Sequence, residues 1–503
     1  MIRFIGFAGV LLAFGIVLGT DYARSSPIGL GWLLHCRDEI FVALNSEDVQ
    51  KLELFCLTVY LVVFWFQLRR ISTANGKPIW RVETVRSGCL AGFCASALWM
   101  YSLGSPQDRV STDVIVLFCG LTLGHGLLVL KVKYWKGHRA TETHEDILNA
   151  LVILLALSVL VQPDWWEKFP YRGHQRWQGP WWNPNHFGLL MAIGLVLAVG
   201  QGLQKLRHRE GTPRRHRLWT QHLLLGFYVL AACLTGFGLV KSYSRGAWLG
   251  AALALVYLGF QLFRFLNYRA RISGIPTNED QAGPVGISWG ALFLRNCLTL
   301  GLTALSVGLL VFWNCMHAHN PVIRRALSMG NVNDFSWRKR LFAYEGALQV
   351  MASKPWGGFG WDQPKVVYDQ FYRPGKVDEG KVIELNDYFM VGMTLGLPAL
   401  ACFAGYLWLS LSTKSRERSS NLESEKAAWL RSVCRAAVIV LLVGFWLDRG
   451  LFWLALTTPF WILLELGRED LTTNGHELTR MGLEADGFSN QELDIASDIE
   501  QSV

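Results

Sequence analysis

The feature that most constrains this chain is a succession of long apolar runs separated by short polar segments. A helix needs about 20 mostly apolar residues to cross a bilayer, and about twelve runs approach that length. They cover residues 4–20, 52–68, 87–104, 112–130, 147–163, 185–203, 219–240, 246–263, 294–314, 388–412, 431–447 and 450–466. The pattern predicts an all-α integral membrane protein with about 12 transmembrane helices, occupying residues 1–466 as one polytopic domain.

Composition supports this interpretation. Hydrophobic residues make up 51% of the 503 residues and charged residues only 17%, against about 25% charged residues in soluble domains. Disordered, collagen-like and disulfide-scaffold proteins are thereby excluded. The first run resembles a signal peptide, but Arg3 is the only basic residue before it, and no clean cleavage site of small residues follows it. We therefore expect a retained helix.

The basic residues predict the orientation. The clusters follow every second apolar run, as expected if both termini are cytoplasmic. They lie at residues 69–86, 131–139, 205–217, 264–271 and 414–418. Most of the excess positive charge behind the net charge of +9 lies in these loops, where it sets the orientation of the chain in the membrane. We therefore expect no nucleic-acid partner. Residues 467–503 are acidic and lack apolar periodicity, which predicts a disordered cytoplasmic tail.

The cysteines show no metal-binding pattern. The sequence contains no CxxC and no Cys/His spacing typical of a metal site, so no metal is expected. Cys36 and Cys315 are both predicted near the outer face, where a disulfide between them is an open alternative.

Two predicted outward segments carry unusual polar residues at the start of a membrane run. Asn183, Asn185 and His186 follow a tryptophan-rich loop, and they either bind substrate or cap and turn the chain. The second segment is the hairpin from Lys241 to Trp248, where Ser242 or Ser244 can cap the next helix and Arg245 and Lys241 place positive charge outside. A helix start beside a guanidinium is a potential anion site. The alternative for Arg245 is a snorkelling side chain or an ion pair with Asp448.

The third segment is the long outer loop at residues 315–387. Its spacing of apolar and charged residues predicts an amphipathic helix, for which Asp334 is a possible N-cap. The apolar residues are Trp337, Leu341, Phe342, Ala343, Leu348, Val350 and Met351. A Pro- and Gly-rich turn follows at 355–361. Glu384 and Asp387 are three residues apart, so on a helix they share a face, either as a functional pair or as a solvated acidic helix start.

Four motifs occur in order within residues 150–412. They are G-x-x-x-N-P-N at 179–185, S-R-G-A at 244–247, R-x-x-x-Y-x-x-A-L at 340–348 followed by P-x-x-G-x-G at 355–360, and N-x-Y at 386–388 with a glycine at 396. Together they resemble the O-antigen ligase and polymerase family of bacterial membrane glycosyltransferases. Two positions depart from its pattern: Tyr344 replaces the usual tryptophan, and Leu385 stands where the family has the histidine regarded as its base.

The resemblance implies an enzyme of cell-surface polysaccharide biosynthesis, such as that of lipopolysaccharide, in the bacterial inner membrane with its site on the periplasmic face. Its donor would be a glycan linked to polyprenyl (undecaprenyl) diphosphate, its acceptor a hydroxyl of a glycan, lipid or protein, and no cofactor is implied. Ligase and polymerase activity are not distinguished.

The candidate site residues follow from both lines of reasoning. The catalytic candidates are Glu384 and Asp387, with His186, His317 and His319 as alternative bases. Candidates for binding diphosphate are Arg245 and Arg340, with Arg338 as the alternative register, and Lys241. Candidates for binding substrate are Asn183, Asn185, His186, Tyr243, Asn386 and Tyr388.

Two other classes of function fit a polytopic chain. A secondary transporter should show an internal repeat and ionisable residues near the midplane of the membrane, whereas this sequence shows no repeat and concentrates polar residues at the predicted outer mouth. A non-catalytic member of the family is the other alternative, because Leu385 cannot accept a proton.

Overall fold

The computed structural model describes the chain in segments. The described residues are 54–65, 78–103, 112–134, 138–160, 170–171, 174–181, 183–207, 215–272, 321–328, 335–361, 363–373, 386–412 and 422–468. The predicted runs at 4–20 and 294–314, the acidic tail beyond Arg468, the pair Cys36 and Cys315, and Asp334 lie outside them, as do Glu384, Leu385, His317 and His319.

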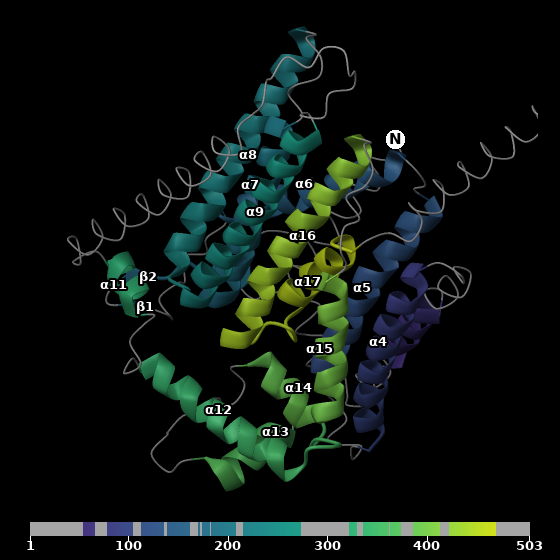
Figure 1. Ribbon diagram of the computed structural model, residues 1–503. Coiled ribbons are helices and arrows are strands. Elements are labelled where there is room, and N and C mark those ends of the chain that lie inside the picture. Colours follow the sequence, from purple (N-terminus) through teal and green to yellow (C-terminus); the bar gives the residue numbers. More distant parts are fainter. Residues whose placement is uncertain are drawn as a thin grey trace, which may run out of the picture.

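The described part is almost entirely helical (Figure 1). Helix Leu54–Trp65 precedes the long helices of the bundle. They are α4 (Pro78–Leu103), α5 (Thr112–Tyr134), α6 (His138–Ser158), α7 (Pro184–Arg207), α8 (Arg215–Ser242), α9 (Arg245–Ile272), α15 (Leu397–Ser412), α16 (Leu422–Leu447) and α17 (Leu454–Leu466). Each predicted run within the described residues coincides with one of these helices or ends in one. The all-α prediction is confirmed, apart from a two-residue antiparallel pairing of β1 (Pro170–Tyr171) with β2 (His174–Gln175).

Among the residues that the structure describes, four helices are long and apolar enough to cross a membrane. They are Pro184–Leu206, His222–Ser242, Arg245–Leu266 and Glu425–Leu447. The count of twelve and the cytoplasmic placement of both termini stay predictions.

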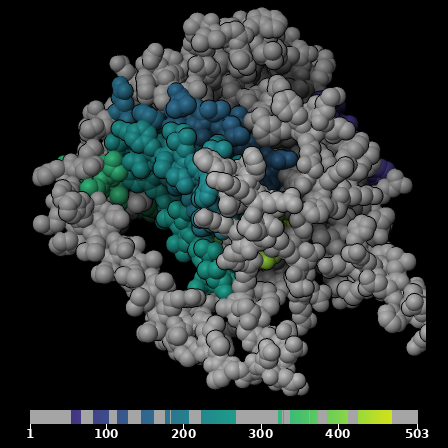
Figure 2. All heavy atoms as spheres, turned by 90° about the horizontal axis from the view of Figure 1, so that it is seen from above, coloured from purple at the N-terminus to yellow at the C-terminus, as the bar shows by residue number. Residues whose placement is uncertain are grey.

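Helices α8 and α9 are apolar yet largely exposed. Only 28% and 22% of their apolar, membrane-length stretches are buried. The side chains of Leu223, Val256 and Phe260 are all more than half exposed. Seen from above, their atoms form a continuous teal surface (Figure 2). Exposed apolar surface on this scale is costly in water and favourable against lipid tails, which agrees with a membrane-embedded bundle.

A second set of helices gathers at one end of the bundle. These are α12 (Phe335–Ser353), α13 (Gln363–Val367), the π-helical turn η7 (Tyr368–Tyr372) and α14 (Asp387–Leu395). Helices α12, α13 and α14 lie across the lower end of the bundle in Figure 1, with α11 (Pro321–Leu327) and the two strands to one side. We call this end, defined by α12 to α14, the lower end.

The predicted amphipathic helix is present as α12, and the expected apolar residues Ala343, Val350 and Met351 are buried, but three of its larger apolar residues are not. Leu341, Phe342 and Leu348 are 48%, 41% and 54% exposed. The face that packs on the bundle consists of smaller residues, among them Ala343 and Ala347, with Val350. Small side chains allow α12 to lie close to α14 and η7, which hydrophobic periodicity alone could not predict.

The P-x-x-G-x-G motif forms the expected sharp turn and packs against the break between α14 and α15. Gly358, Gly360 and Gly396 all have positive φ angles, of 64°, 94° and 90°. The amides of Phe359 and Gly360 donate to carbonyls at the end of α14, at 2.8 and 3.0 Å. A Cβ on Gly358 would lie 2.5 Å from the Thr394 carbonyl oxygen. The motif glycines thus permit close backbone contact where α14 ends.

Candidate functional site

The hairpin between α8 and α9 carries the S-R-G-A motif. Tyr243 takes a left-handed conformation with φ 51°, and Ser244 caps α9 by accepting the amide of Ala247 at 3.4 Å. The expected serine cap is therefore present. Arg245 is the first residue of α9 and is 9% exposed. Its Nη1 donates to the carbonyl and the hydroxyl of Ser328, at 3.0 and 3.1 Å.

Two further arginines converge on the same hairpin. The Nε of Arg176 donates to the carbonyl of Ser242 at 2.9 Å, and the Nε of Arg325 donates to the carbonyl of Tyr243 at 3.3 Å. Burial, together with the charges of Arg325 and Arg245, lowers the pKa of Arg176 to about 10, so it still carries its charge at neutral pH. Two guanidinium groups thus bind the backbone of the hairpin from which Arg245 extends.

Asp448, directly after α16, connects this hairpin with α12. Its Oδ1 accepts from Nη2 of Arg340 at 3.1 Å and from Nδ2 of Asn185 at 3.1 Å. Asn185 in turn accepts from Arg176 at 2.7 Å. Burial raises the pKa of Asp448, while Arg340, Arg176 and Arg245 lower it. Four arginines and one carboxylate therefore meet here, leaving three positive charges in excess among these groups.

The structure distinguishes the two arginine registers on α12. Arg340 donates through Nε to the carbonyl of Leu447 at 2.9 Å, in addition to its bond with Asp448. Arg338, two residues earlier, is exposed. Lys241 points elsewhere, with its Nζ 5.5 Å from the ring centroid of Phe237. Of the predicted cations, Arg245 and Arg340 are thus the two that flank Asp448.

The segment from the last two residues of α16 to the residue before α17, residues 446–453, contacts the other predicted residues, and we call it the α16–α17 turn. The ring of His186 donates through Nε2 to the carbonyl of Arg449 at 2.7 Å, a tautomer assigned from that partner, and it packs on Trp453 at 4.5 Å between centroids. Arg449 forms an ion pair with Asp113, the second residue of α5. His186 thus holds the turn in place.

Asp387 is fully buried and binds the same turn. Its Oδ2 accepts the amides of Gly450 and Leu451, at 2.7 and 2.8 Å. Burial raises the pKa of Asp387 to about 7, opposed by these amides and by Arg449. Of the two alternatives for this acidic residue, the solvated helix start does not apply to Asp387, because its carboxylate is enclosed and anchors the turn to α14.

The side chains of Asn183, Asn386 and Tyr388 form hydrogen bonds with backbone groups of the bundle. Asn183 caps α7, its Oδ1 accepting the Asn185 amide at 2.9 Å, with Pro184 at the favoured first position. Asn386 caps α14 through two amides and donates to the Trp446 carbonyl at 3.1 Å. Tyr388 donates its hydroxyl to the Leu442 carbonyl at 3.0 Å. The contacts of Asn183, Asn386 and Tyr388 are those of positioning residues.

Three charged residues of this site, Arg176, Arg325 and Arg449, were not among the sequence candidates. Arg176 lies in a short hairpin without a recognisable motif, and Asn185 and Asp448 are 263 positions apart. Arg325 and Arg449 lie in segments predicted to face away from the cytoplasmic basic loops. A cation in such a segment is unusual, and this was the one sequence signal that could have identified them. No group of His, Cys, Asp and Glu that could hold a metal occurs among the described residues.

The motifs and their shared end of the bundle agree with a comparison against protein families. Residues 230–404 match the family model of O-antigen ligase. This match covers the α8–α9 hairpin, α12 and α14 with their motifs, and it confirms the resemblance seen in the sequence. Neither the curated proteins nor the solved structures give a match. Residues 230–404 are thus similar to an O-antigen ligase, and four of the described helices are long and apolar enough to cross a membrane.

Proposed function

We propose that the lower end of the bundle transfers or polymerises glycan from a polyprenyl-diphosphate-linked donor onto an acceptor hydroxyl, at the periplasmic face of the inner membrane. The observation that carries this proposal is the excess of three positive charges among Arg176, Arg245, Arg325 and Arg340 with Asp448. A diphosphate bears about two to three negative charges at neutral pH, and arginine pairs well with phosphate oxygens.

In the proposed reaction the acceptor oxygen attacks the anomeric carbon of the donor sugar. The bond between this carbon and the diphosphate oxygen breaks, and its electron pair leaves with the polyprenyl diphosphate. The arginines stabilise the charge that develops on this leaving group, in a site where burial strengthens electrostatic interactions.

The acceptor proton needs a base, and we propose Glu384, next to the position of the family's histidine. Asp387, the other carboxylate candidate, is assigned a positioning role because Oδ2 is bound to two amides. Asn185 is assigned to orienting Arg176, and His186 to holding the α16–α17 turn.

The test compares Arg340→Ala and Arg245→Ala with Arg338→Ala in cells that lack the native protein. Removing a group that stabilises transition-state charge costs about 10²–10³ in rate, so the first two variants should lose most glycan transfer at normal protein level. Arg338→Ala, which removes an exposed cation of the same helix, should transfer normally. Full transfer by Arg245→Ala and Arg340→Ala would remove both residues from the mechanism.

A further inference from the structure

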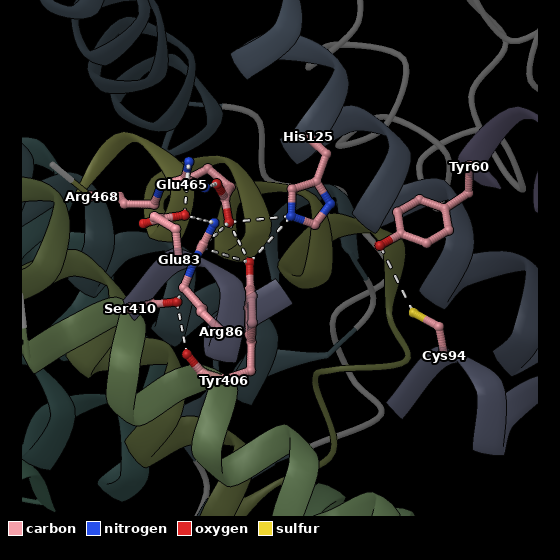
Figure 3. Close-up of polar contacts among 9 residues, drawn as sticks. All are labelled: Tyr60, Glu83, Arg86, Cys94, His125, Tyr406, Ser410, Glu465 and Arg468. Carbon is pink, nitrogen blue, oxygen red and sulfur yellow. Dashed lines mark hydrogen bonds and ion pairs between the residues drawn. The ribbon is translucent and has the colours of Figure 1, made fainter. Parts of the chain in front are cut away.

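A second group of charged side chains is buried between α4, α5, α15 and α17, away from the lower end (Figure 3). Glu465 is its centre. The Nη1 of Arg86 lies 3.1 Å from Oε1 of Glu465, and Nη1 of Arg468 binds Oε2. Tyr406 donates its hydroxyl to Oε1, and Nε2 of His125 lies 3.2 Å from the same oxygen.

The charges of this group balance. Oε2 of Glu83 forms ion pairs with both arginines, at 3.1 Å from Nη2 of Arg86 and 3.5 Å from Nη2 of Arg468, so two guanidinium groups face two carboxylates. All members are at most 6% exposed. A balanced, enclosed network offers no net charge to a ligand, and burying it costs desolvation free energy. Its effect is to fix four helices relative to one another.

The same helices hold the α16–α17 turn at their other ends. Helix α5 carries Asp113, which pairs with Arg449. Helix α14, which anchors Gly450 and Leu451 through Asp387, leads through one residue into α15. Helix α17 begins directly after the turn.

Similar lengths of helix separate the contacts at the buried network from the contacts at the α16–α17 turn. At 1.5 Å per residue, the rise from Asp113 to His125 is about 18 Å, from Leu397 to Tyr406 about 14 Å, and from Leu454 to Glu465 about 16 Å. A change in the axial position of one helix at the buried network would therefore be transmitted to the turn and to Asp448, which holds Arg340.

We infer that Glu465 and Tyr406 are positioning residues of the glycan-transfer site: with Arg86, Arg468 and His125 they set the axial register of α5, α15 and α17, and so the placement of the α16–α17 turn. This inference rests on the proposed function where the rate of glycan transfer is measured. The position of the α16–α17 turn can be measured whether or not the protein transfers glycan.

The experiment uses Glu465→Gln, which removes the charge and keeps the shape, and Tyr406→Phe, which removes only a hydroxyl and so covers the case in which Glu465→Gln fails to fold. The matched control is Tyr228→Phe. Its hydroxyl donates to Asn149 at 2.7 Å, and it likewise ties two helices, α6 and α8. Register is measured by cross-linking Asp113→Cys to Arg449→Cys with a short bis-maleimide, in full-length protein whose native cysteines are replaced.

Both variants should lower the cross-linking yield, and kcat for glycan transfer should fall about tenfold or more, since misplacement by about 1 Å can cost up to about 10²-fold. Tyr228→Phe should change neither quantity. Unchanged cross-linking in a folded Glu465→Gln or Tyr406→Phe protein would overturn the inference. If the parent protein transfers no glycan, the proposed function fails, while the cross-linking comparison still decides the positioning role.

Discussion

Single residues decide which charges reach the site. Arg338 and Arg340 are nearly adjacent in sequence and were alternatives for one role, yet only Arg340 binds Asp448, because a helix turns about 100° per residue. The hairpin arginine was predictable from its motif and its unusual side of the membrane. Asp448 was named only as an alternative partner of Arg245, and its bonds with Arg340 and Asn185 were not predicted. Arg176 was not predicted at all, because its place depends on contacts between distant segments.

The buried carboxyl group of Asp387 predicts how the stability of the folded protein depends on pH. Its pKa is about 7 in the folded protein and about 3.9 in an unfolded chain. Between these values the folded state binds more protons, so the contribution of this residue to stability falls as pH rises from about 4 to 7. Thermal unfolding midpoints in detergent should therefore decline less between pH 5 and 7 in Asp387→Asn.

The control for this measurement is Glu345→Gln, which removes an exposed carboxylate from α12 and should keep the wild-type slope. An equal slope in wild type and Asp387→Asn would show that the buried carboxylate does not titrate in this range.

At the scale of elements, apolar run length located the helices well, because every run within the described residues becomes a helix or ends in one. The apolar pattern was a poor guide to which face of a helix is buried. In α12, Ala343 and Ala347 pack on the bundle together with Val350 and Met351, whereas the larger Leu341, Phe342 and Leu348 are exposed, since the available space is set by α14 and η7. The break of the run 388–412 at Gly396 was likewise hidden, because an apolar stretch does not reveal a turn made by one glycine.

The contact between the 355–360 turn and the end of α14 yields a second prediction. Gly358→Ala would force a side chain onto a residue with φ 64° and against the Thr394 carbonyl, so we expect destabilisation of about 1–3 kcal/mol. Gly357→Ala is the matched control, because nothing lies within 4 Å of its added Cβ, and it should stay within about 0.5 kcal/mol. Chemical denaturation in detergent measures both, and equal stability of the two variants would contradict the proposed contact.

At the scale of the whole molecule, the bundle separates two kinds of polar chemistry. The arginine-rich site with Asp448 is at the lower end, and the balanced network around Glu465 lies within the helices. Composition predicted a membrane protein and the basic loops predicted its orientation, but neither could show the buried network, because Arg86 appeared only as one of the basic residues assigned to a cytoplasmic loop.

The orientation is testable by labelling. With the lower end facing the periplasm, a cysteine at Arg338 should react with a membrane-impermeant maleimide added to intact spheroplasts. A cysteine at Arg416, in a loop predicted to be cytoplasmic, should react only after lysis. The reverse pattern would place the arginine site on the cytoplasmic side and contradict the proposed use of a periplasmic donor.

The central claim is that the arginine-rich end of this bundle transfers glycan from a polyprenyl-diphosphate donor. The most direct measurement supplies purified, reconstituted protein with a polyprenyl-diphosphate oligosaccharide and glycan, lipid or protein acceptors, and follows the acceptor product and the released polyprenyl diphosphate together. We predict that they form in equal amounts and that both are lost in Arg245→Ala. One added block would indicate a ligase and a ladder of repeats a polymerase. No product with any acceptor, with counterflow of a small solute in the same proteoliposomes, would contradict the claim.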